Sequence, residues 1–524
     1  MTSSVEVGAS GAEQPQGDQP GDRSLRLVRC AVLGLVATTS IVVGALLGGR
    51  AFENHLPGAW YFGMQGGLFG SLGSDASQPP IYAVAAVYGG LILLTRVWFG
   101  FLLQLSRPHR VPVKKVVFVV AIWAIPLLLA PPLFSKDVYS YAGQGEMVSH
   151  HIDPYTYGTG ILGSTPFSSL SDAVWTNTPS PYGPTFLTID GALDDVTGHQ
   201  ILPDIVLLRL LELAGLALMV GALPTLARAV GRDPAQAVLF GAGCPLVLTT
   251  LLSGAHNDAL MVGLLVAGLA VALRVGTVPG ILLCAVAAGV KAPAGLGVLF
   301  LGWAWAGPGA SIRRRVAHTA AAGVIAVSTL EIVAKVSGLG WGWLHTTTAA
   351  NHSFTGITPI GGLSRAASDL AGLVNVHFSA LGARTVLGDI SLACATGIGI
   401  WLLLRSDELG VTRSLGLTLL VVALLNPILW AWYATWGVVV LAPVATGRLR
   451  TVVLFVSTFE VFAGVSSIRG IFDTLLGAGV LPVLILVAVV LFMAIVPLGP
   501  FERSRRTRIT APPVPGRLMA GLGT

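Results

Sequence analysis

Long apolar segments recur along most of this chain, separated by shorter polar stretches. The first two cover about residues 27–49 and 81–103. A helix of about 20 apolar residues is long enough to cross the hydrocarbon core of a bilayer. Further segments of this kind lie near 116–134, 202–229, 236–253, 256–274, 278–307, 316–336, 384–404, 414–446, 451–470 and 475–497. The pattern predicts an all-α polytopic membrane protein.

Two of these segments, 278–307 and 414–446, are longer than a single span requires. Each could be one long tilted helix or a tight pair of helices. Lys291 and Pro293 interrupt the first segment near its middle, and Asn426-Pro427 interrupts the second. These breaks favour pairs, which gives about 12–14 spans in total.

The basic residues support the paired layout. They gather at 107–115, Arg228, Arg232, Arg274, 313–315, Arg405, Arg413, 448–450 and 503–508. With both long segments treated as pairs, every cluster falls on the same side as the two termini. Because excess Lys and Arg mark cytoplasmic loops, we expect both termini in the cytoplasm and the long connections outside the cell (inner) membrane. The net charge of +6 is then a sign of topology, and no nucleic-acid partner is expected.

Composition agrees with this class of protein. Hydrophobic residues make up 53% of the chain and charged residues 11%, whereas soluble proteins carry about 25% charged residues. A disordered chain, a disulfide scaffold and a soluble dehydrogenase are excluded. Four cysteines lie in apolar segments without a CxxC pair, which favours buried packing over a disulfide or a metal site. They are Cys30, Cys244, Cys284 and Cys394.

The chain is predicted to have one large domain between two tails. Residues 1–24 are expected to form a disordered cytoplasmic tail, 25–500 the transmembrane domain, and 501–524 a basic, flexible cytoplasmic tail. The domain has three long outer connections, at about 50–80, 135–201 and 338–383. The second is rich in acidic residues, aromatic residues and prolines, and long connections in compact proteins are usually functional or disordered. Its aromatic and proline content argues against disorder, so we expect the chemistry there.

Several motifs in and after this connection resemble those of a known family. They are KDVYSYAGQGE at 136–146, HIDPYTYG at 151–158, WTNTPSPYGPTFLTID at 175–190, SGAHNDALMVGLL at 253–265, GVKAPAGLGVL at 289–299 and NPILWAWYATWGVVVLAP at 426–443. The set is similar to the actinobacterial polyprenol-phosphomannose-dependent α-1,6-mannosyltransferases, which are membrane glycosyltransferases of the GT-C class. The resemblance implies a GT-C-type bundle of transmembrane helices with a large first catalytic outer loop.

The resemblance also implies a reaction. Mannose would pass, with inversion, from polyprenyl-phosphate-mannose to a mannosylated phosphatidylinositol or α-1,6-mannan acceptor of lipomannan and lipoarabinomannan. The membrane lipid would be a further partner, and no cofactor would be needed. Because phosphate is a good leaving group, a single general base suffices.

Asp137 is the candidate for that base. It follows the third apolar segment directly, at the expected water–lipid boundary, and it matches the loop aspartate that the resemblance implies. The other interpretation is a solvated charge at a helix end. Asp153 and Glu146 are reserve candidates, although Asp153 precedes Pro154 and is equally typical of a turn.

The donor phosphate needs cations on the outer side, where they are scarce. Lys291 lies in the middle of an apolar segment and is a candidate, with carboxylate pairing or snorkelling as the alternative. His256 could donate to the phosphate, and Asp258 could orient it or bind a sugar hydroxyl; a helix cap through Asn257 or Asp258 explains the same motif. Arg469 is a weaker candidate at another outer end.

Sugar binding commonly uses aromatic platforms with polar partners. Trp432 and Tyr433 are candidates for this role, in an aromatic group with Trp430 and Trp436. The alternative is an interfacial aromatic belt, and Trp436 is expected to belong to the belt or the core. The second outer connection adds further sugar or acceptor candidates, with Trp175 beside the last of them: Asp153, Tyr155 and Tyr182.

A metal site is not expected from the sequence. There is no DxD-like pair, and the neighbours in Asp194-Asp195 and His150-His151 would point apart along a strand or a helix. Three other functions remain open: a transporter or lipid flippase, an enzyme using an arabinosyl or glucosyl polyprenyl phosphate, and a noncatalytic scaffold.

Overall fold

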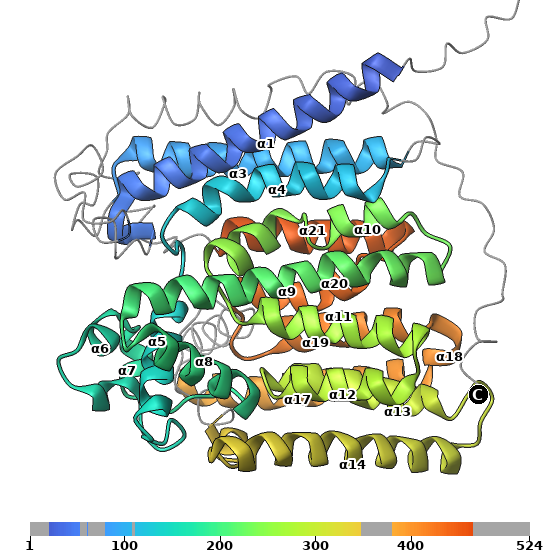
Figure 1. The fold of residues 1–524 in the computed structure, drawn as a ribbon. Coiled ribbons are helices and arrows are strands. Elements are labelled where there is room, and N and C mark those ends of the chain that lie inside the picture. The colour runs from blue at the N-terminus through green and yellow to red at the C-terminus, as the bar shows by residue number, and fades with distance from the viewer. Residues whose placement is uncertain (1–19, 53–59, 61–78, 107–110, 347–379, 465–524) are drawn as a thin grey trace, which may run out of the picture.

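The computed structural model describes residues 20–52, 60, 79–106, 111–346 and 380–464. Across these residues every regular element is helical, which confirms the all-α class. Long helices lie side by side in one bundle, and a group of short helices covers one end of it (Figure 1). The predicted segment 475–497, the tail at 501–524 and Arg469 lie outside the described residues.

The first part of the bundle precedes the large outer connection. Its helices are α1 (Pro20–Gly48), the short η1 (Gly49–Phe52), α3 (Ile81–Leu105) and α4 (Val113–Leu129). Helix α1 begins inside the segment that was expected to be a disordered tail. The indoles of Trp98 and Trp123 are buried here, and Trp123 donates to the carbonyl oxygen of Cys30 at 3.0 Å.

The outer connection folds into short helices that rest on the end of the bundle (Figure 1). They are α5 (Asp137–Ser149), η2 (Thr159–Leu162), α6 (Pro166–Leu170), α7 (Ala173–Thr176) and α8 (Pro184–Thr197). Helices α5 and α8 cross closely, because Gly145 packs against Asp190 and Gly191 packs against Val148. The absence of any side chain at these glycines brings the two helices together, and the connection is ordered, as predicted.

The remaining helices complete the bundle. They are α9 (Ile201–Ala229), α10 (Pro234–Phe240), η3 (Val247–Ser253), α11 (Asp258–Arg274), α12 (Thr277–Ala288), η4 (Ala292–Ala294), α13 (Gly295–Trp305), α14 (Ile312–Ser337), α17 (Ala380–Leu404), α18 (Ser406–Leu409), α19 (Val411–Leu425), η5 (Ala431–Tyr433), α20 (Ala434–Leu441) and α21 (Gly447–Ala463). Helix α14 lies at the edge of the bundle and exposes apolar side chains such as Val324, Val327 and Ile332. An apolar outer surface of this kind suits contact with lipid.

Five of the described helices are long and apolar enough to cross a membrane. A sixth span arises if η3 and α11, which meet at a bend of 113°, are counted as one broken span. Four shorter apolar segments of helix lie at Thr277–Ala288, Ala292–Trp305, Val411–Leu425 and Ala431–Leu441. A polytopic membrane protein is thereby confirmed, while about 12–14 spans stays a prediction.

Both long apolar segments form helix hairpins, as the sequence predicted. In the first, Gly297 at the start of α13 packs against Cys284 in the middle of α12, while Gly295 lies near Ala288. The two helices therefore run antiparallel. Helices α19 and α20 are antiparallel for the same reason, because Gly416 packs against Leu441 and Gly437 against Leu420.

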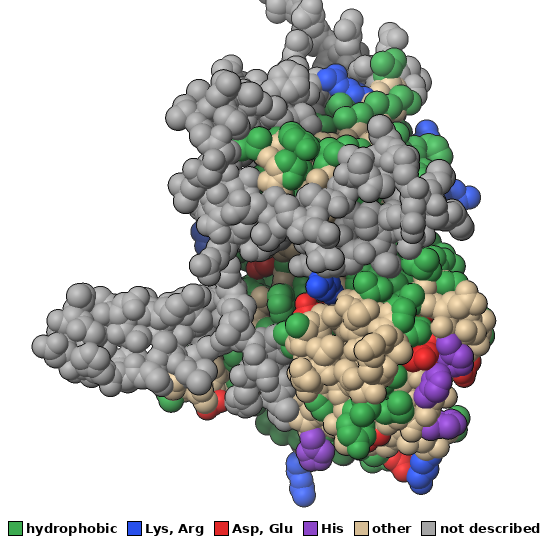
Figure 2. Space-filling model, turned by 90° about the vertical axis from the view of Figure 1, so that its left-hand side faces the viewer, with side chains coloured by type: hydrophobic (Ala, Val, Ile, Leu, Met, Phe, Trp, Pro, Cys, Tyr) green, Lys and Arg blue, Asp and Glu red, His purple; other side chains and the backbone are tan. Residues whose placement is uncertain are grey.

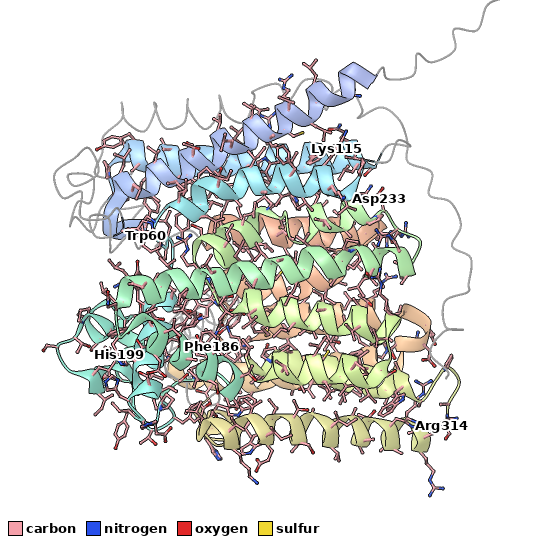
Figure 3. All side chains as sticks on the ribbon, viewed as in Figure 1. Trp60, Lys115, Phe186, His199, Asp233 and Arg314 are labelled. Carbon is pink, nitrogen blue, oxygen red and sulfur yellow. The ribbon has the colours of Figure 1, made fainter. Side chains whose placement is uncertain are left out.

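The labelled lysine and arginine both lie at one end of the bundle. Lys115 and Arg314 lie at one end, and His199 lies at the opposite end with the outer connection (Figure 3). This arrangement agrees with the predicted gathering of basic residues on one side. Three cysteines are buried as expected, but the prediction is wrong for Cys394, which is exposed on the outward side of α17. An apolar bilayer lets a thiol face outward without contacting water.

Candidate active site

Asp137 is held in place at the start of α5. The chain leaves α4 at Leu129, and the backbone N–H of Asp137 donates to the hydroxyl of Ser135 at 3.1 Å. One carboxylate oxygen, Oδ1, accepts a hydrogen bond of 3.1 Å from Trp175 Nε1. The other, Oδ2, lies 3.7 Å from His256 Nε2. The side chain is 14% exposed, so the carboxylate is oriented yet still reachable.

The surroundings of Asp137 suit a general base. Burial raises the pKa of its carboxyl, because a charged group loses hydration there, while His256, Lys291 and the Trp175 hydrogen bond oppose the rise. A base works best when its pKa lies near the operating pH. The raised pKa therefore moves this carboxylate in the direction that proton abstraction requires.

His256 supports this arrangement from the break between η3 and α11. Its Nδ1 lies 2.7 Å from the carbonyl oxygen of Thr250, so this nitrogen donates and fixes the tautomer. In the neutral ring Nε2 accepts from the Ser135 hydroxyl, 3.0 Å away. The ring stacks on Trp432 with centroids 3.7 Å apart. Because both nitrogens are engaged, His256 positions Ser135 and, through the Ser135 hydroxyl, the backbone N–H of Asp137. Phosphate binding would require His256 to release Ser135.

Lys291 lies at the turn of the α12–α13 hairpin, inside a group of aromatic rings. Its Nζ is 2.8 Å from Asp258 Oδ2, which is the carboxylate pairing that the sequence left open. The same Nζ lies over the rings of Tyr433, Tyr182 and Trp436 at 4.9, 5.7 and 5.8 Å. An ammonium group has three donors. One contacts Asp258, and the others remain suited to phosphate oxygens.

The hairpin that carries Lys291 is braced by the start of α8. The backbone N–H groups of Gly183 and Phe186 donate to the carbonyl oxygens of Val290 and Gly289, at 3.3 and 3.2 Å. A Cβ atom on Gly183 would overlap the Gly289 carbonyl, so glycine is required for this approach. The Pro-Tyr-Gly-Pro motif thus connects the 135–201 segment to the hairpin that carries Lys291.

Helix α11 is capped by a residue from another helix. Asn257 makes no side-chain cap, and both of its buried amide atoms lack a hydrogen-bond partner among the described residues. Asp258 is occupied by Lys291 and by the indole N–H of Trp436. Glu212 of α9 instead accepts from the Leu260 backbone N–H at 3.1 Å. The capping role that the sequence allowed for Asn257 or Asp258 is therefore filled by Glu212.

The aromatic candidates gather around this site. Trp430 and Trp432 stack at 5.0 Å, and Tyr433 and Trp436 stack at 4.5 Å. Tyr182 packs edge-on against Tyr141 at 5.2 Å. Trp432 and Trp436 are buried against charged site residues, which argues against an interfacial belt for them.

The remaining candidates lie apart from Asp137 and Lys291. Asp153 is exposed and forms a turn: it accepts from the Tyr155 backbone N–H at 2.9 Å and from the Thr156 hydroxyl at 2.6 Å. Tyr155 is buried and packs against Gly342. Glu146 lies at the other end of α5, where it contacts His199. Their predicted roles in base catalysis or sugar binding stay predictions.

Sequence reasoning missed several supporting residues. Ser135 and Glu212 were not considered, and Trp175 was expected only beside a sugar platform. Trp436 was assigned to the belt or the core; it is buried in the core, but its hydrogen bond to Asp258 was not foreseen. Glu212 carried a usable signal, because a carboxylate inside an apolar helix is costly and marks function. The others became recognisable only when the fold brought them beside Asp137 and Asp258.

Comparison with known proteins identifies related chains. The family model described as "Alpha-(1->6)-mannopyranosyltransferase, N-terminal domain" matches residues 31–307, and the model described as "MptB C-terminal domain" matches residues 357–497. No solved structure matches this chain.

Three curated relatives illustrate the range of similarity. α-(1→6)-Mannopyranosyltransferase A of Mycobacterium tuberculosis is 35% identical over 339 residues, which cover 62% of this chain and 64% of that protein. A probable α-(1→6)-mannopyranosyltransferase of Mycolicibacterium smegmatis is 30% identical, with 68% of this chain and 70% of the relative covered. α-(1→6)-Mannopyranosyltransferase B of Corynebacterium glutamicum is 27% identical, with 84% and 77% covered.

Proposed function

This chain belongs to the α-(1→6)-mannopyranosyltransferase family, and we propose that it is a membrane mannosyltransferase that extends an α-1,6-mannan chain. The proposed donor is polyprenyl-phosphate-mannose. The proposed acceptor is a mannosylated phosphatidylinositol or a growing α-1,6-mannan of lipomannan or lipoarabinomannan. The observation that carries the proposal is the reachable carboxylate of Asp137, which Trp175 orients close to the cation Lys291. His256 holds the backbone of Asp137 through Ser135.

In the proposed reaction Asp137 acts as the general base. It takes the proton of the acceptor 6-hydroxyl as that oxygen attacks C1 of mannose. The bond between C1 and the phosphate oxygen breaks, and polyprenyl phosphate leaves with the electron pair. Attack from the opposite face converts a β-linked donor into an α-linked product.

Lys291 stabilises the negative charge on the departing phosphate. Its ammonium group is held by Asp258 and by three rings, so little reorganisation is needed when charge develops. Tyr433 and Tyr182 supply aromatic rings for the sugar beside it. Trp432 stacks between His256 and Trp430, so it supports the site without a free ring face of its own. Because a fixed cation already serves the phosphate, we propose that transfer needs no metal and no cofactor.

The site is proposed to face the outside of the cell membrane, with both termini in the cytoplasm. Asp137 begins α5, and the hairpin of Lys291 is bonded to the start of α8 through Gly183 and Val290. Lys115 and Arg314 lie at the end of the bundle opposite to His199, which follows α8 (Figure 3). Basic residues mark the cytoplasmic side. A lipid-borne donor would then enter from the bilayer while the mannan acceptor approaches from water.

The test is mannose transfer in membranes, from polyprenyl-phosphate-mannose to a short α-1,6-mannoside. Asp137→Asn should lower the rate about 10²–10⁴-fold, the usual loss when a general base is removed. Asp233→Asn is the matched control, since Asp233 caps α10 at the far end of the bundle and asparagine caps helices equally well. The control should transfer mannose at the wild-type rate.

Three outcomes would contradict parts of the proposal. A normal rate for Asp137→Asn would move the base to Asp153 or Glu146. Transfer only from an arabinosyl or glucosyl polyprenyl phosphate would overturn the donor. Absence of transfer by the inserted wild-type chain would overturn the enzyme itself in favour of a transporter or a scaffold.

A further inference from the structure

A second group of polar side chains gathers at the far end of α5. Glu146 lies on α5, and His150 is the first residue after that helix. Asp194 lies on α8, and His199 lies between α8 and α9. His199 Nδ1 is 3.0 Å from Glu146 Oε2 and 2.7 Å from Asp194 Oδ2. His150 Nδ1 is 3.6 Å from Glu146 Oε1. On this face of the molecule histidine and acidic side chains lie next to each other (Figure 2).

The spacing of these atoms suits a metal ion. One ligand atom from each of Glu146, His150 and His199 lies within 4.8 Å of the others, and the same holds for Asp194, Asp195 and His199. Ligands at 2.0–2.1 Å from a tetrahedral zinc ion are separated by about 3.3 Å. The two distances from His199 Nδ1, 2.7 Å to Asp194 Oδ2 and 3.0 Å to Glu146 Oε2, lie slightly below this value.

A second observation concerns Asp194, which is fully buried. Its Oδ2 accepts from Ser149 at 2.6 Å and faces His199, but its Oδ1 has no hydrogen-bond partner. Two more buried aspartates lie close by, Asp190 on α8 and Asp204 on α9. Among the residues that the structure describes, neither has a hydrogen-bond partner for either oxygen. In the part of the chain that the structure describes, no Lys or Arg pairs with these carboxylates.

Buried carboxylates without partners are costly unless a proton or a cation neutralises them. One protonated His199 could pair with Glu146 and Asp194, but it offers a single charge to several acids. A divalent ion offers two charges and direct bonds. His199 is 44% exposed, so an ion can reach the group from water.

We propose that Glu146, His150, Asp194 and His199 bind a divalent transition-metal ion of the zinc type. Imidazole together with carboxylate ligands favours zinc over calcium or magnesium, which prefer oxygen ligands alone. His150 Nδ1 lies 3.0 Å from the Glu146 backbone carbonyl, so it donates there and Nε2 keeps its lone pair.

The ion would join the end of α5 to the corner between α8 and α9. Because α5 begins with Asp137, fixing its far end also restricts the position of the proposed base. The ion would therefore have a structural role, separate from the metal-independent transfer chemistry. A zinc site can exist whether or not the chain transfers mannose, so the two proposals can fail independently.

The test uses the full-length protein in detergent, stripped with a chelator and titrated calorimetrically with zinc chloride. The wild type should bind about one equivalent with a Kd of about 1 μM or tighter. His199→Asn should weaken binding at least about tenfold. His151→Asn is the matched control, because both histidines have positive φ, 58° and 56°, and asparagine tolerates that conformation.

His151 lies outside the ligand group, so its variant should bind zinc like the wild type. Equal zinc affinity of His199→Asn and the wild type, or no binding by the wild type, would overturn the proposal. If His199→Asn does not fold, Glu146→Gln gives the same comparison. If neither variant folds, the cobalt-loaded wild type provides the test. Visible absorption of a low-symmetry cobalt site supports the proposal, and the spectrum of hydrated cobalt overturns it.

Discussion

The acidic side chains near the two ends of α5 differ in their partners. At its start, Asp137 faces His256 and Trp175, and the neighbouring Asp258 has both a lysine and an indole N–H. At its far end, Asp190, Asp194 and Asp204 are fully buried but leave carboxylate oxygens without hydrogen-bond partners among the described residues. One helix thus connects a site whose acids have a cation and N–H donors, here called the balanced end, to a site with excess negative charge.

The difference indicates what each end can bind. Where the protein supplies its own cations, an added ion has little to gain, and the groups are set to handle a proton and an anionic substrate. Where carboxylates outnumber their partners, the free energy of bringing in a cation is favourable. Removing a partner at the balanced end should therefore do harm, while removing an acid at the other end should relieve the protein.

The largest expected effect comes from breaking the balanced end at Lys291. Lys291→Met should lower kcat/KM for the polyprenyl-phosphate donor about 10²–10³-fold, by analogy with the loss of one transition-state donor. It also leaves Asp258 buried without its cation, so the thermal unfolding temperature in detergent should fall. Transfer assays and unfolding of the purified chain measure the two effects.

Lys115→Met is the control for this prediction, because Lys115 is exposed at the opposite end of the bundle. It should retain both transfer and stability. Normal transfer by Lys291→Met would mean that the phosphate is bound elsewhere, and the contrast between the two ends of α5 would lose its functional meaning.

A smaller but still large effect is expected from the brace between the start of α8 and the hairpin that carries Lys291. Gly183→Ala would place a methyl group on the Gly289 carbonyl oxygen and push the Lys291 hairpin away from α8. A displacement of about 1 Å can cost about 10²-fold in rate. Gly221→Ala, on α9, has nothing within 4 Å of the added carbon and should behave as the wild type. Equal rates for both variants would show that the hairpin tolerates movement.

Much of the balanced end could be predicted from the sequence, and for a physical reason. Charged residues are rare in apolar segments, so Lys291 and the Asp258 motif stand out, and Asp137 follows directly after an apolar segment. The breaks that produce the two helix hairpins were visible because Pro293 and Asn426-Pro427 interrupt long apolar segments. What the sequence could not give was the pairing of Lys291 with Asp258, which brings together residues from two different helices.

The other end of α5 could not be predicted. Glu146 and His199 are 53 residues apart, and the ligand group takes side chains from α5, α8 and the link to α9. Adjacent pairs such as Asp194-Asp195 suggested that no metal site exists. The relevant partners were instead set by the close crossing of α5 and α8 at Gly145, which no local pattern encodes.

A moderate effect is expected from the hydrogen bond that tunes Asp137. Trp175 stabilises the charged carboxylate, so Trp175→Phe should raise the pKa of Asp137 further. Because a general base acts only when deprotonated, the acid limb of the pH–rate profile should move to higher pH. Trp401→Phe, at an exposed indole, is the control. An unmoved acid limb would show that Asp137 does not control it.

The smallest expected effect has the opposite sign and lies at the acidic end. Asp190→Asn removes one buried carboxylate that has no hydrogen-bond partner and is repelled by Asp204 and Asp194. In chelator-treated protein at neutral pH, the unfolding free energy of the variant should exceed that of the wild type by about 1–2 kcal/mol. Its thermal unfolding temperature should therefore be higher. Zinc should narrow the difference, because the ion offsets the same repulsion in the wild type. Destabilisation by this substitution would mean that Asp190 has a partner after all, and the two ends of α5 would then be balanced alike.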